Sequence, residues 1–419
     1  MNKIFSSLLL IISVVLIQLP IAASVSAAGA EDAEKPQRKT QLVGPSVGKK
    51  VAKAFELYSA DDIPGALVIL LDIEASKVYD KAYVDRFIAI MYATVGNEEE
   101  KAIKYLKSAV EPDILNQGDQ DAGLKLLADL QMQTKAYEEA LVNYKAWMDF
   151  TGKSDGDTWT KIANAYYALK QLDKMIVPAD NAIAAYGDKQ NKNPYILKLT
   201  SYYETKKFKE AVKTLETVVQ IFPEDKTWWT QLGMFYLLVE DYQKGLETLD
   251  LAYKQGFLEK ESEIKTLASL YSQNGVPYKA ALLLEKHIDS GLVTRDDKNL
   301  SSLANAWHAA QHIDKAASYY GELAKMTNLS KHYSKQGMLL KQDEQFKGAI
   351  VALNKALELG VSNKGRLYMS IAESHFYLEQ YKQAYKAINL AMKDPKTRKS
   401  AKGWVGFIKD TAQRKNVAI

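Results

Sequence analysis

The stretch "WTQLGMFY", Trp229 to Tyr236, decides the fold class of this chain. It has the spacing W-x2-L-G-x2-Y, and a second segment follows with helical spacing at Tyr242, Gly245, Leu249 and Ala252. The two segments predict a pair of antiparallel helices that approach closely. A small residue is needed where such helices cross, here Gly233 in the first helix and Gly245 in the second, and large side chains fill the space on either side.

The same pattern recurs ten times, at intervals of 33 to 38 residues. The small position of the second helix falls at Ala66, Ala102, Ala140, Met175, Ala211, Gly245, Ala280, Ala316, Ala349 and Ala384. The matching first-helix position falls at Ala54, Ile90, Ala128, Ala163, Leu199, Gly233, Ala268, Ala304, Gly337 and Ala372. The pattern resembles the tetratricopeptide repeat (TPR), whose period is about 34 residues. That resemblance implies an all-α fold, a right-handed TPR superhelical solenoid of about ten helix-turn-helix repeats.

The repeats are predicted over residues 46–392, and residues 393–419 are predicted to form a capping helix and a basic tail. In the capping helix Trp404, Phe407 and Ile408 are expected to face the repeats while the lysines stay in water. A polar outer face of this kind is what the open end of a solenoid requires.

The fourth repeat departs from the pattern. Met175 replaces the usual small residue, and Pro178 falls inside the predicted second helix, where proline removes a hydrogen bond and favours a kink. Polar, turn-rich loops at 151–158 and 187–194 flank this repeat. We therefore expect a bend or hinge between repeats 1–4 and repeats 5–10.

The N-terminus predicts export. A lysine at position 3 precedes an apolar run and a stretch of small residues, which is the pattern of a secretory signal peptide over residues 1–27. An uncleaved anchor helix is the alternative, because the apolar run is nearly long enough to span a bilayer. Residues 28–45 are predicted to be a flexible linker. The mature chain is expected to lie in the periplasm without spanning a membrane.

The composition narrows the chemistry. The chain of 419 residues has no cysteine, which excludes disulfides, thiolate catalysis and cysteine-ligated zinc. Its net charge of +4 is small for this length and predicts no nucleic-acid partner. We find no enzyme signature and expect no cofactor.

Two local motifs suggest chemistry at first sight. Gly44, Gly48, Lys49 and Lys50 lie in a glycine-lysine stretch, but the spacing is not that of a Walker loop and no strand precedes it. A turn that caps the first repeat helix is the better interpretation. His308 and His312 have the i, i+4 spacing of metal ligands on one helical face, without a third ligand nearby; solvated or groove-lining histidines are the favoured alternative.

The inner face of the solenoid is the candidate partner-binding site, because the first helices of such repeats line it. Its predicted residues are Asn164, Tyr167, Tyr203, Lys265, Lys298, Asn305, His308, Lys331, Lys341 and Arg366, with Glu373 as the acid among them. A groove with this lining should attract an extended acidic segment or a C-terminal carboxylate. An ordinary solvated, lysine-rich face is the alternative.

A narrower resemblance comes from residues 38–59, "RKTQLVGPSVGKKVAKAFELYS", which follow the signal peptide and lead into the repeats. This arrangement resembles periplasmic TPR proteins associated with TonB energy-transduction systems of Gram-negative bacteria. The resemblance implies a non-enzymatic scaffold for protein partners, TonB or its inner-membrane motor proteins among them, in the uptake of nutrients such as iron complexes. Two alternatives stay open. One is a cell-envelope assembly factor that binds glycan or anionic polymer through a basic groove, and the other is a metal-assisted hydrolase at the two histidines.

Overall fold

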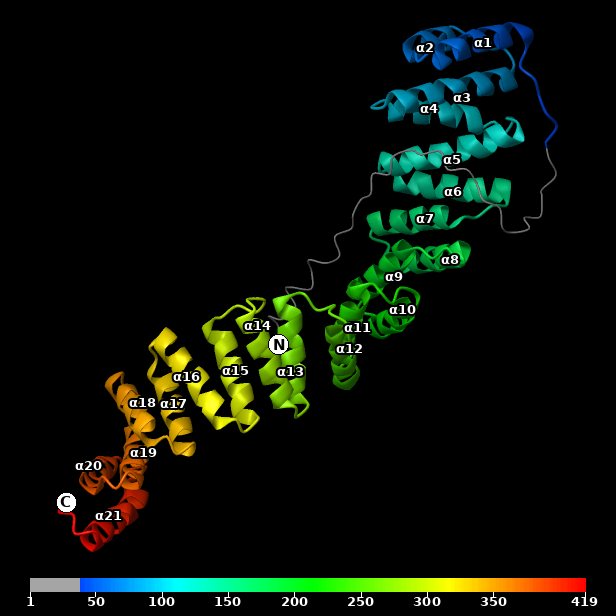
Figure 1. Ribbon diagram of the computed structural model, residues 1–419. Helices are drawn as coiled ribbons and strands as arrows, with labels where there is room; N and C mark the ends of the chain where they lie inside the picture. The colour runs from blue at the N-terminus through cyan, green and yellow to red at the C-terminus, as the bar shows by residue number, and fades with distance from the viewer. Residues whose placement is uncertain (1–37) are drawn as a thin grey trace. The chain divides into compact units, whose positions relative to one another are not determined.

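The computed structural model describes residues 38–419, and the predicted signal peptide lies outside this range (Figure 1). Across residues 38–419 the chain forms 21 α-helices and no β-strand, which confirms the all-α prediction. The described residues divide into two compact units, 38–221 and 222–419, which we call the N-terminal unit and the C-terminal unit.

The N-terminal unit contains five helical hairpins. Its helices are α1 (Pro45–Ser59), α2 (Ile63–Leu71), α3 (Val78–Val95), α4 (Glu99–Val110), α5 (Gln117–Gln133), α6 (Tyr137–Thr151), α7 (Gly156–Ala168), α8 (Ile176–Tyr186), α9 (Lys192–Glu204) and α10 (Phe208–Ile221). A short 3-10 turn, η2 (Leu172–Met175), precedes α8.

The C-terminal unit contains five more hairpins and one additional helix. Its helices are α11 (Lys226–Leu238), α12 (Tyr242–Lys254), α13 (Glu261–Gln273), α14 (Pro277–Asp289), α15 (Asp297–Ala309), α16 (Ile313–Thr327), α17 (Ser330–Gln342), α18 (Phe346–Glu358), α19 (Lys364–Tyr377), α20 (Tyr381–Ala391) and α21 (Arg398–Arg414).

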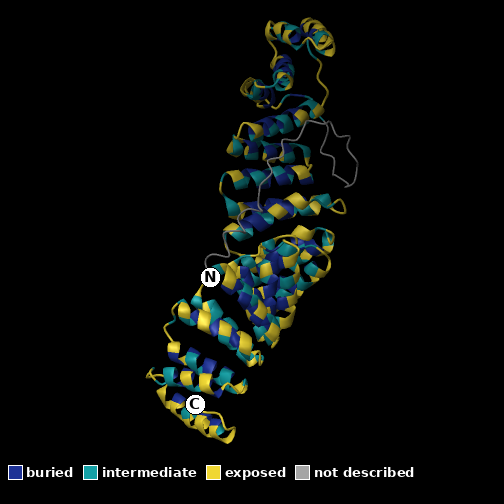
Figure 2. Cartoon of the chain, turned by 60° about the vertical axis from the view of Figure 1, so that its left-hand side comes forward, coloured by how far each residue is buried: buried dark blue, intermediate teal, exposed yellow. Residues whose placement is uncertain are grey.

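The hairpins pack through the predicted small positions. All ten second-helix positions are buried, including Met175, and so are nine of the ten first-helix positions. At Gly233 a side-chain carbon would come within 2.5 Å of Leu249, so the close approach requires glycine there. In Figure 2 the buried residues follow the sides on which neighbouring helices face each other.

The exception is the second repeat, where the prediction of Ile90 is wrong by one residue. Ala89 is fully buried at the crossing, whereas Ile90 is only half-buried. The reason is that α3 continues one residue further past the crossing than the other first helices do before its turn at Gly96.

A uniform turn sets the register of all ten hairpins in the described chain. Three residues join the two helices, and the middle one has a positive φ. These middle residues are Asp61, Asn97, Lys135, Lys170, Lys206, Glu240, Gly275, Gln311, Glu344 and Glu379. Because the turn length is fixed, the crossing residues of a hairpin lie twelve positions apart, with the second repeat as the exception.

Two features of the fourth repeat differ from the prediction. Pro178 does not kink a helix, because the 3-10 turn η2 comes first and α8 begins only at Ile176. Proline in a first turn removes no helical hydrogen bond. The chain also divides after Ile221 rather than after repeat 4, and α8 and α9 pack against each other within the N-terminal unit.

The end of the predicted linker, residues 38–44, is fixed rather than free. The Arg38 guanidinium donates to the Asp113 backbone oxygen at 2.7 Å, and the Gln41 amide donates to Asn116 Oδ1 at 2.8 Å. The backbone N–H of Gly44, just before α1, donates to the Asp80 carboxylate at 3.0 Å. These bonds tie the segment to α3 and to the loop before α5.

The C-terminal unit ends with α21, which packs on α20. Ile408 is fully buried and Lys402 and Lys409 are exposed, as predicted for a cap. Phe407 is 49% exposed, contrary to the prediction, although its ring centre lies 5.0 Å from that of Phe376. Among residues 38–419 no helix has the length and apolar character needed to cross a bilayer.

Candidate partner-binding surface

Three consecutive first helices of the C-terminal unit carry a positively charged side chain at the same position of the repeat. Lys298 on α15, Lys331 on α17 and Arg366 on α19 each precede the crossing residue of their helix by six positions. All three side chains are exposed, and no carboxylate of the described residues lies within 4 Å of any of them. We call these three residues the cation row. Lysine and arginine held in the open without a counter-ion are available to an anionic partner.

Lys265 and Lys341, predicted for the same groove, are already neutralised. The Lys265 ammonium lies 3.2 Å from the Glu261 carboxylate, and Lys341 forms an ion pair with Glu373. Glu261 also accepts hydrogen bonds from the Thr294 hydroxyl and the Asn299 amide. These donors, with Lys265, lower the pKa of Glu261 to about 2. The charge of these two lysines therefore serves contacts within the protein.

Uncharged side chains lie along the cation row. Asn305 is exposed on α15, and its Oδ1 accepts a hydrogen bond from the Tyr320 hydroxyl at 2.5 Å. His308 is half-buried about one helical turn after Asn305. Burial is the main cause that lowers the pKa of His308, and the positive charge of Lys335 adds to it. A neutral imidazole is thus the form expected at neutral pH. Met338 on α17 is half-buried, with its sulfur 3.2 Å from the Ser370 hydroxyl of α19, and adds an adaptable apolar contact.

The three candidates in the other unit have contacts of their own. The Asn164 amide donates to the Thr160 carbonyl of its own helix at 3.0 Å. Tyr167 packs against the core of repeats 4 and 5, and the Tyr203 ring centre lies 6.1 Å from that of Phe208. The candidates of the C-terminal unit therefore all lie on its first helices α13, α15, α17 and α19. Asn164, Tyr167 and Tyr203 belong to a different unit.

The metal-ligand interpretation of His308 and His312 is wrong in its geometry. Helix α15 ends at Ala309, so His312 lies beyond it, as the residue that precedes α16. Its ring packs against Trp307 and Tyr278, with centres 5.1 and 5.3 Å away. No group of three potential metal ligands occurs within residues 38–419.

The glycine-lysine stretch is a helix start, as the sequence indicated. Gly44 precedes α1 and donates its N–H to the Asp80 carboxylate. Lys50 pairs with Asp72 at 2.8 Å. Both features are used within the fold.

No family model matches this chain, and no curated protein matches it. The chain is similar to several solved structures of helical repeat proteins. A tetratricopeptide repeat protein from Parabacteroides merdae is 12% identical, with a TM-score of 0.34 over 63% of this chain and 99% of that protein. YrrB, described as a TPR protein with an unusual peptide-binding site, is 16% identical, with a TM-score of 0.35 over 43% of this chain and 91% of its own. Cut9–Hcn1 of the APC/C is 12% identical, with a TM-score of 0.28 over 86% and 84% of the two chains. At these identities the likeness concerns the fold alone.

The ten helical hairpins of this chain, with their small crossing residues, form the TPR-type solenoid fold that the sequence predicted. The first helices of the C-terminal unit carry lysines paired with carboxylates, Lys265 and Lys341, and the unpaired cations of the cation row. The sequence alone does not distinguish the paired cations from the unpaired ones. Glu261 was missed as an acid of the groove because it lies at the first position of α13 rather than on the predicted inward positions. Its spacing of four residues from Lys265 on one helix is the signal that could have revealed the pair.

Proposed function

We propose that this TPR protein is a non-enzymatic scaffold that binds an extended acidic segment of a protein partner along the cation row. The observation that carries the proposal is the repetition of Lys298, Lys331 and Arg366 at one repeat position without carboxylate partners. A periodic row of charges on a repeat protein suits a ligand whose own charges are periodic.

The spacing of the row specifies the ligand further. Packed helices lie roughly 8–10 Å apart, and α17 and α19 contact each other directly. A polyproline II segment advances about 3.1 Å per residue with three residues per turn, so every third side chain lies on one side at about 9 Å intervals. The preferred ligand is therefore an extended segment with Asp or Glu at positions i, i+3 and i+6.

The cellular setting is proposed from the sequence. The predicted signal peptide supports a periplasmic location, and the resemblance of residues 38–59 supports a role as an accessory component of a TonB-dependent nutrient uptake system. TonB and its inner-membrane motor proteins are then the first partners to test. The scaffold would hold a segment of such a partner in the periplasmic gap.

A peptide titration tests the binding site. A fluorescent nine-residue peptide with acids at i, i+3 and i+6 should bind more tightly than a peptide of the same composition with its acids adjacent. The triple variant Lys298→Ala, Lys331→Ala, Arg366→Ala should weaken binding on the order of tenfold or more, since three charge contacts are lost. The matched control removes three exposed lysines of second helices, Lys279, Lys325 and Lys347. Equal losses in the two triple variants would refute the site.

Crosslinking in cells tests the partner. A photo-crosslinking residue at Met338, beside the row, should capture TonB or a motor protein, whereas one at the exposed Val351 of α18 should not. Capture of the same proteins from both positions would argue against the row. Salt-sensitive binding to an anionic glycan with no captured protein would favour the cell-envelope assembly alternative instead.

A further inference from the structure

The positive charge of this protein is concentrated in its last two helices. Residues 381–419 contain ten lysines and arginines and two acids, whereas residues 1–380 carry a net charge of −4. Of the ten basic side chains, Lys415 makes an ion pair, with Glu379 at 3.3 Å. No carboxylate of the described residues lies within 4 Å of the other nine.

Six of these side chains form two matching stripes. On α20 and just beyond its end the stripe is Lys382, Lys386 and Lys393, and on α21 it is Arg398, Lys402 and Lys409. Both stripes have the spacing i, i+4, i+11. On α21 this spacing keeps the three residues on one side of the helix, whereas Lys393 lies two residues beyond the end of α20. All six side chains are exposed. We call the six residues the terminal basic face.

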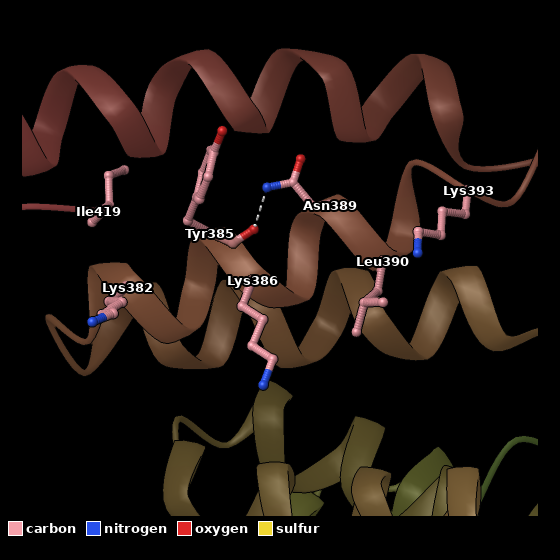
Figure 3. A pocket seen from close by; sticks show the side chains of 7 residues that line it. All are labelled: Lys382, Tyr385, Lys386, Asn389, Leu390, Lys393 and Ile419. Carbon is pink, nitrogen blue, oxygen red and sulfur yellow. Dashed lines mark hydrogen bonds between the residues drawn. The ribbon is translucent and has the colours of Figure 1, made fainter.

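The stripe of α20 lines a shallow pocket together with Tyr385, Asn389, Leu390 and Ile419. Figure 3 shows Lys382, Lys386 and Lys393 around it, with the Tyr385 ring directed toward α21. The Lys409 ammonium lies 5.3 Å from the centre of that ring, which brings the stripe of α21 to the edge of the pocket. The Asn389 amide and then Lys409 lower the pKa of Tyr385.

Apolar side chains lie between the charges. Leu390 and Ile419 line the pocket, and Ile419 is 39% exposed. Val417, two residues before the chain end, is also 39% exposed. Leu390 is half-buried on α20, and Val417 and Ile419 lie in the segment that follows α21. Lysines close to such aliphatic groups match an interface that is both anionic and apolar.

We propose that the terminal basic face docks on a membrane surface that contains anionic phospholipid. Hydrated lysine ammonium groups act as point charges, and a cluster of four to eight of them is sufficient to hold a protein at an anionic lipid surface. Leu390 and Ile419, which line the pocket beside the α20 stripe, would enter the headgroup region. An acidic polymer would use the charges but would have no use for Leu390 and Ile419.

Vesicle co-sedimentation tests the proposal, with the chain from residue 28 so that the apolar N-terminus does not contribute. The protein should bind vesicles of 30% phosphatidylglycerol in phosphatidylcholine at 0.1 M salt and leave them at 0.5 M salt. It should not bind phosphatidylcholine alone. The variant Lys382→Gln, Lys386→Gln, Lys393→Gln should bind on the order of a hundredfold more weakly, because each basic residue near the surface contributes roughly fivefold.

The matched control is Lys279→Gln, Lys325→Gln, Lys347→Gln, which removes the same charge from second helices of the same unit and should bind as the parent does. Equal weakening in the two triple variants, or equal binding to neutral vesicles, would overturn the proposal. Circular dichroism of each variant should match the parent, since all six positions are exposed.

A second pair of variants separates lipid from polymer. Ile419→Ser should weaken vesicle binding severalfold and leave binding to soluble polyphosphate unchanged. Val351→Ser, at an exposed valine on α18, should change neither. If Ile419→Ser leaves vesicle binding unchanged while polyphosphate binds as tightly as the vesicles, the surface recognises polymer and the membrane proposal is wrong.

Discussion

Helices α5 and α17 hold equivalent places in the third and ninth repeats, yet they use charge in opposite ways. Helix α5 carries three aspartates at positions 119, 121 and 129, and each of them accepts bonds from another part of the N-terminal unit. The Tyr144 hydroxyl donates to Asp129 at 2.5 Å, and the Lys161 ammonium lies 2.7 Å from the same carboxylate. Charge on α5 therefore joins α5 to α6 and α7.

Helix α17 carries three lysines, and one of them, Lys331, is exposed and has no carboxylate partner among the described residues. Lys341 pairs with Glu373, and the Lys335 ammonium lies 5.9 Å from the Tyr320 ring centre. Lys331 has no carboxylate partner within the described residues and extends into solvent. Equivalent helices of two repeats therefore differ in how they use charge: the carboxylates of α5 are bonded within the fold, whereas Lys331 of α17 is exposed without a carboxylate partner.

The largest expected effect tests whether the two units unfold independently, as a comparison between their helices assumes. Ala316→Arg places a charge at a fully buried crossing of the C-terminal unit, and Ala140→Arg does the same in the N-terminal unit. Each should destabilise its own unit by about 4 kcal/mol or more, because a buried charge without a partner is added to overpacking. Calorimetry should show one transition shifted and the other retained.

The control is Ala309→Arg, at an exposed position on α15, which should leave both transitions in place. A single transition that shifts equally in the Ala316→Arg and Ala140→Arg variants would mean that the two units unfold as one. Unchanged stability in either variant would contradict the assigned crossing positions.

The repeat architecture was predictable because close helix crossings tolerate few residue types. Nine of ten first-helix positions and all ten second-helix positions followed from the spacing of small residues. The error at Ile90 arose because helix length is not encoded in that spacing, and α3 is one residue longer before its turn. Pro178 was misjudged because a short 3-10 turn before α8 gives no signal distinct from a helix.

The candidate site was predictable only in outline. Lys298, Lys331 and Arg366 are exposed, and their role in binding a partner stays a prediction. Sequence spacing could not show that Lys341 meets Glu373 of the next repeat. Pairing between repeats depends on the rotation of one hairpin against the next, which periodicity does not specify. The division of the chain at residue 221 depends on packing in the same way.

An intermediate loss of stability is expected when a carboxylate of α5 that is bonded within the fold is removed. Asp129→Ala removes the acceptor of the Tyr144 hydroxyl, and Tyr144 is fully buried. The free energy of unfolding of the N-terminal unit should fall by about 1–3 kcal/mol, because a buried donor loses its partner. Chemical denaturation, followed through the unfolding transition of the N-terminal unit, measures this change in free energy.

Lys331→Ala on α17 is the comparison for Asp129→Ala. It should change the stability of the C-terminal unit by less than about 0.5 kcal/mol, as expected for an exposed side chain without a partner. If Lys331→Ala destabilises its unit as much as Asp129→Ala does, the contrast between the two helices is wrong.

The smallest expected effect is the loss of stability in acid that comes from Glu261, a carboxylate bonded to neighbouring side chains. The Thr294 hydroxyl, the Asn299 amide and Lys265 lower the pKa of Glu261 from 4.5 to about 2 in the folded protein. A carboxyl group whose pKa is lower when folded stabilises the fold fully above its unfolded pKa. That contribution is lost as the pH falls from about 4.5 to about 2. Because the Glu261 side chain is 32% exposed, screening should limit the contribution to about 1 kcal/mol or less.

The slope of stability against pH in this range is therefore the quantity to measure for the C-terminal unit. Glu261→Gln should flatten the slope between pH 5 and pH 2.5, since the titrating group is gone. Thr294→Val keeps the carboxyl group but removes its strongest donor, at 2.8 Å, so it should flatten the slope in part by returning the pKa toward 4.5. The same slope in both variants and the parent would show that Glu261 contributes nothing to acid unfolding. Lys265 would then be as open to a partner as the three residues of the cation row.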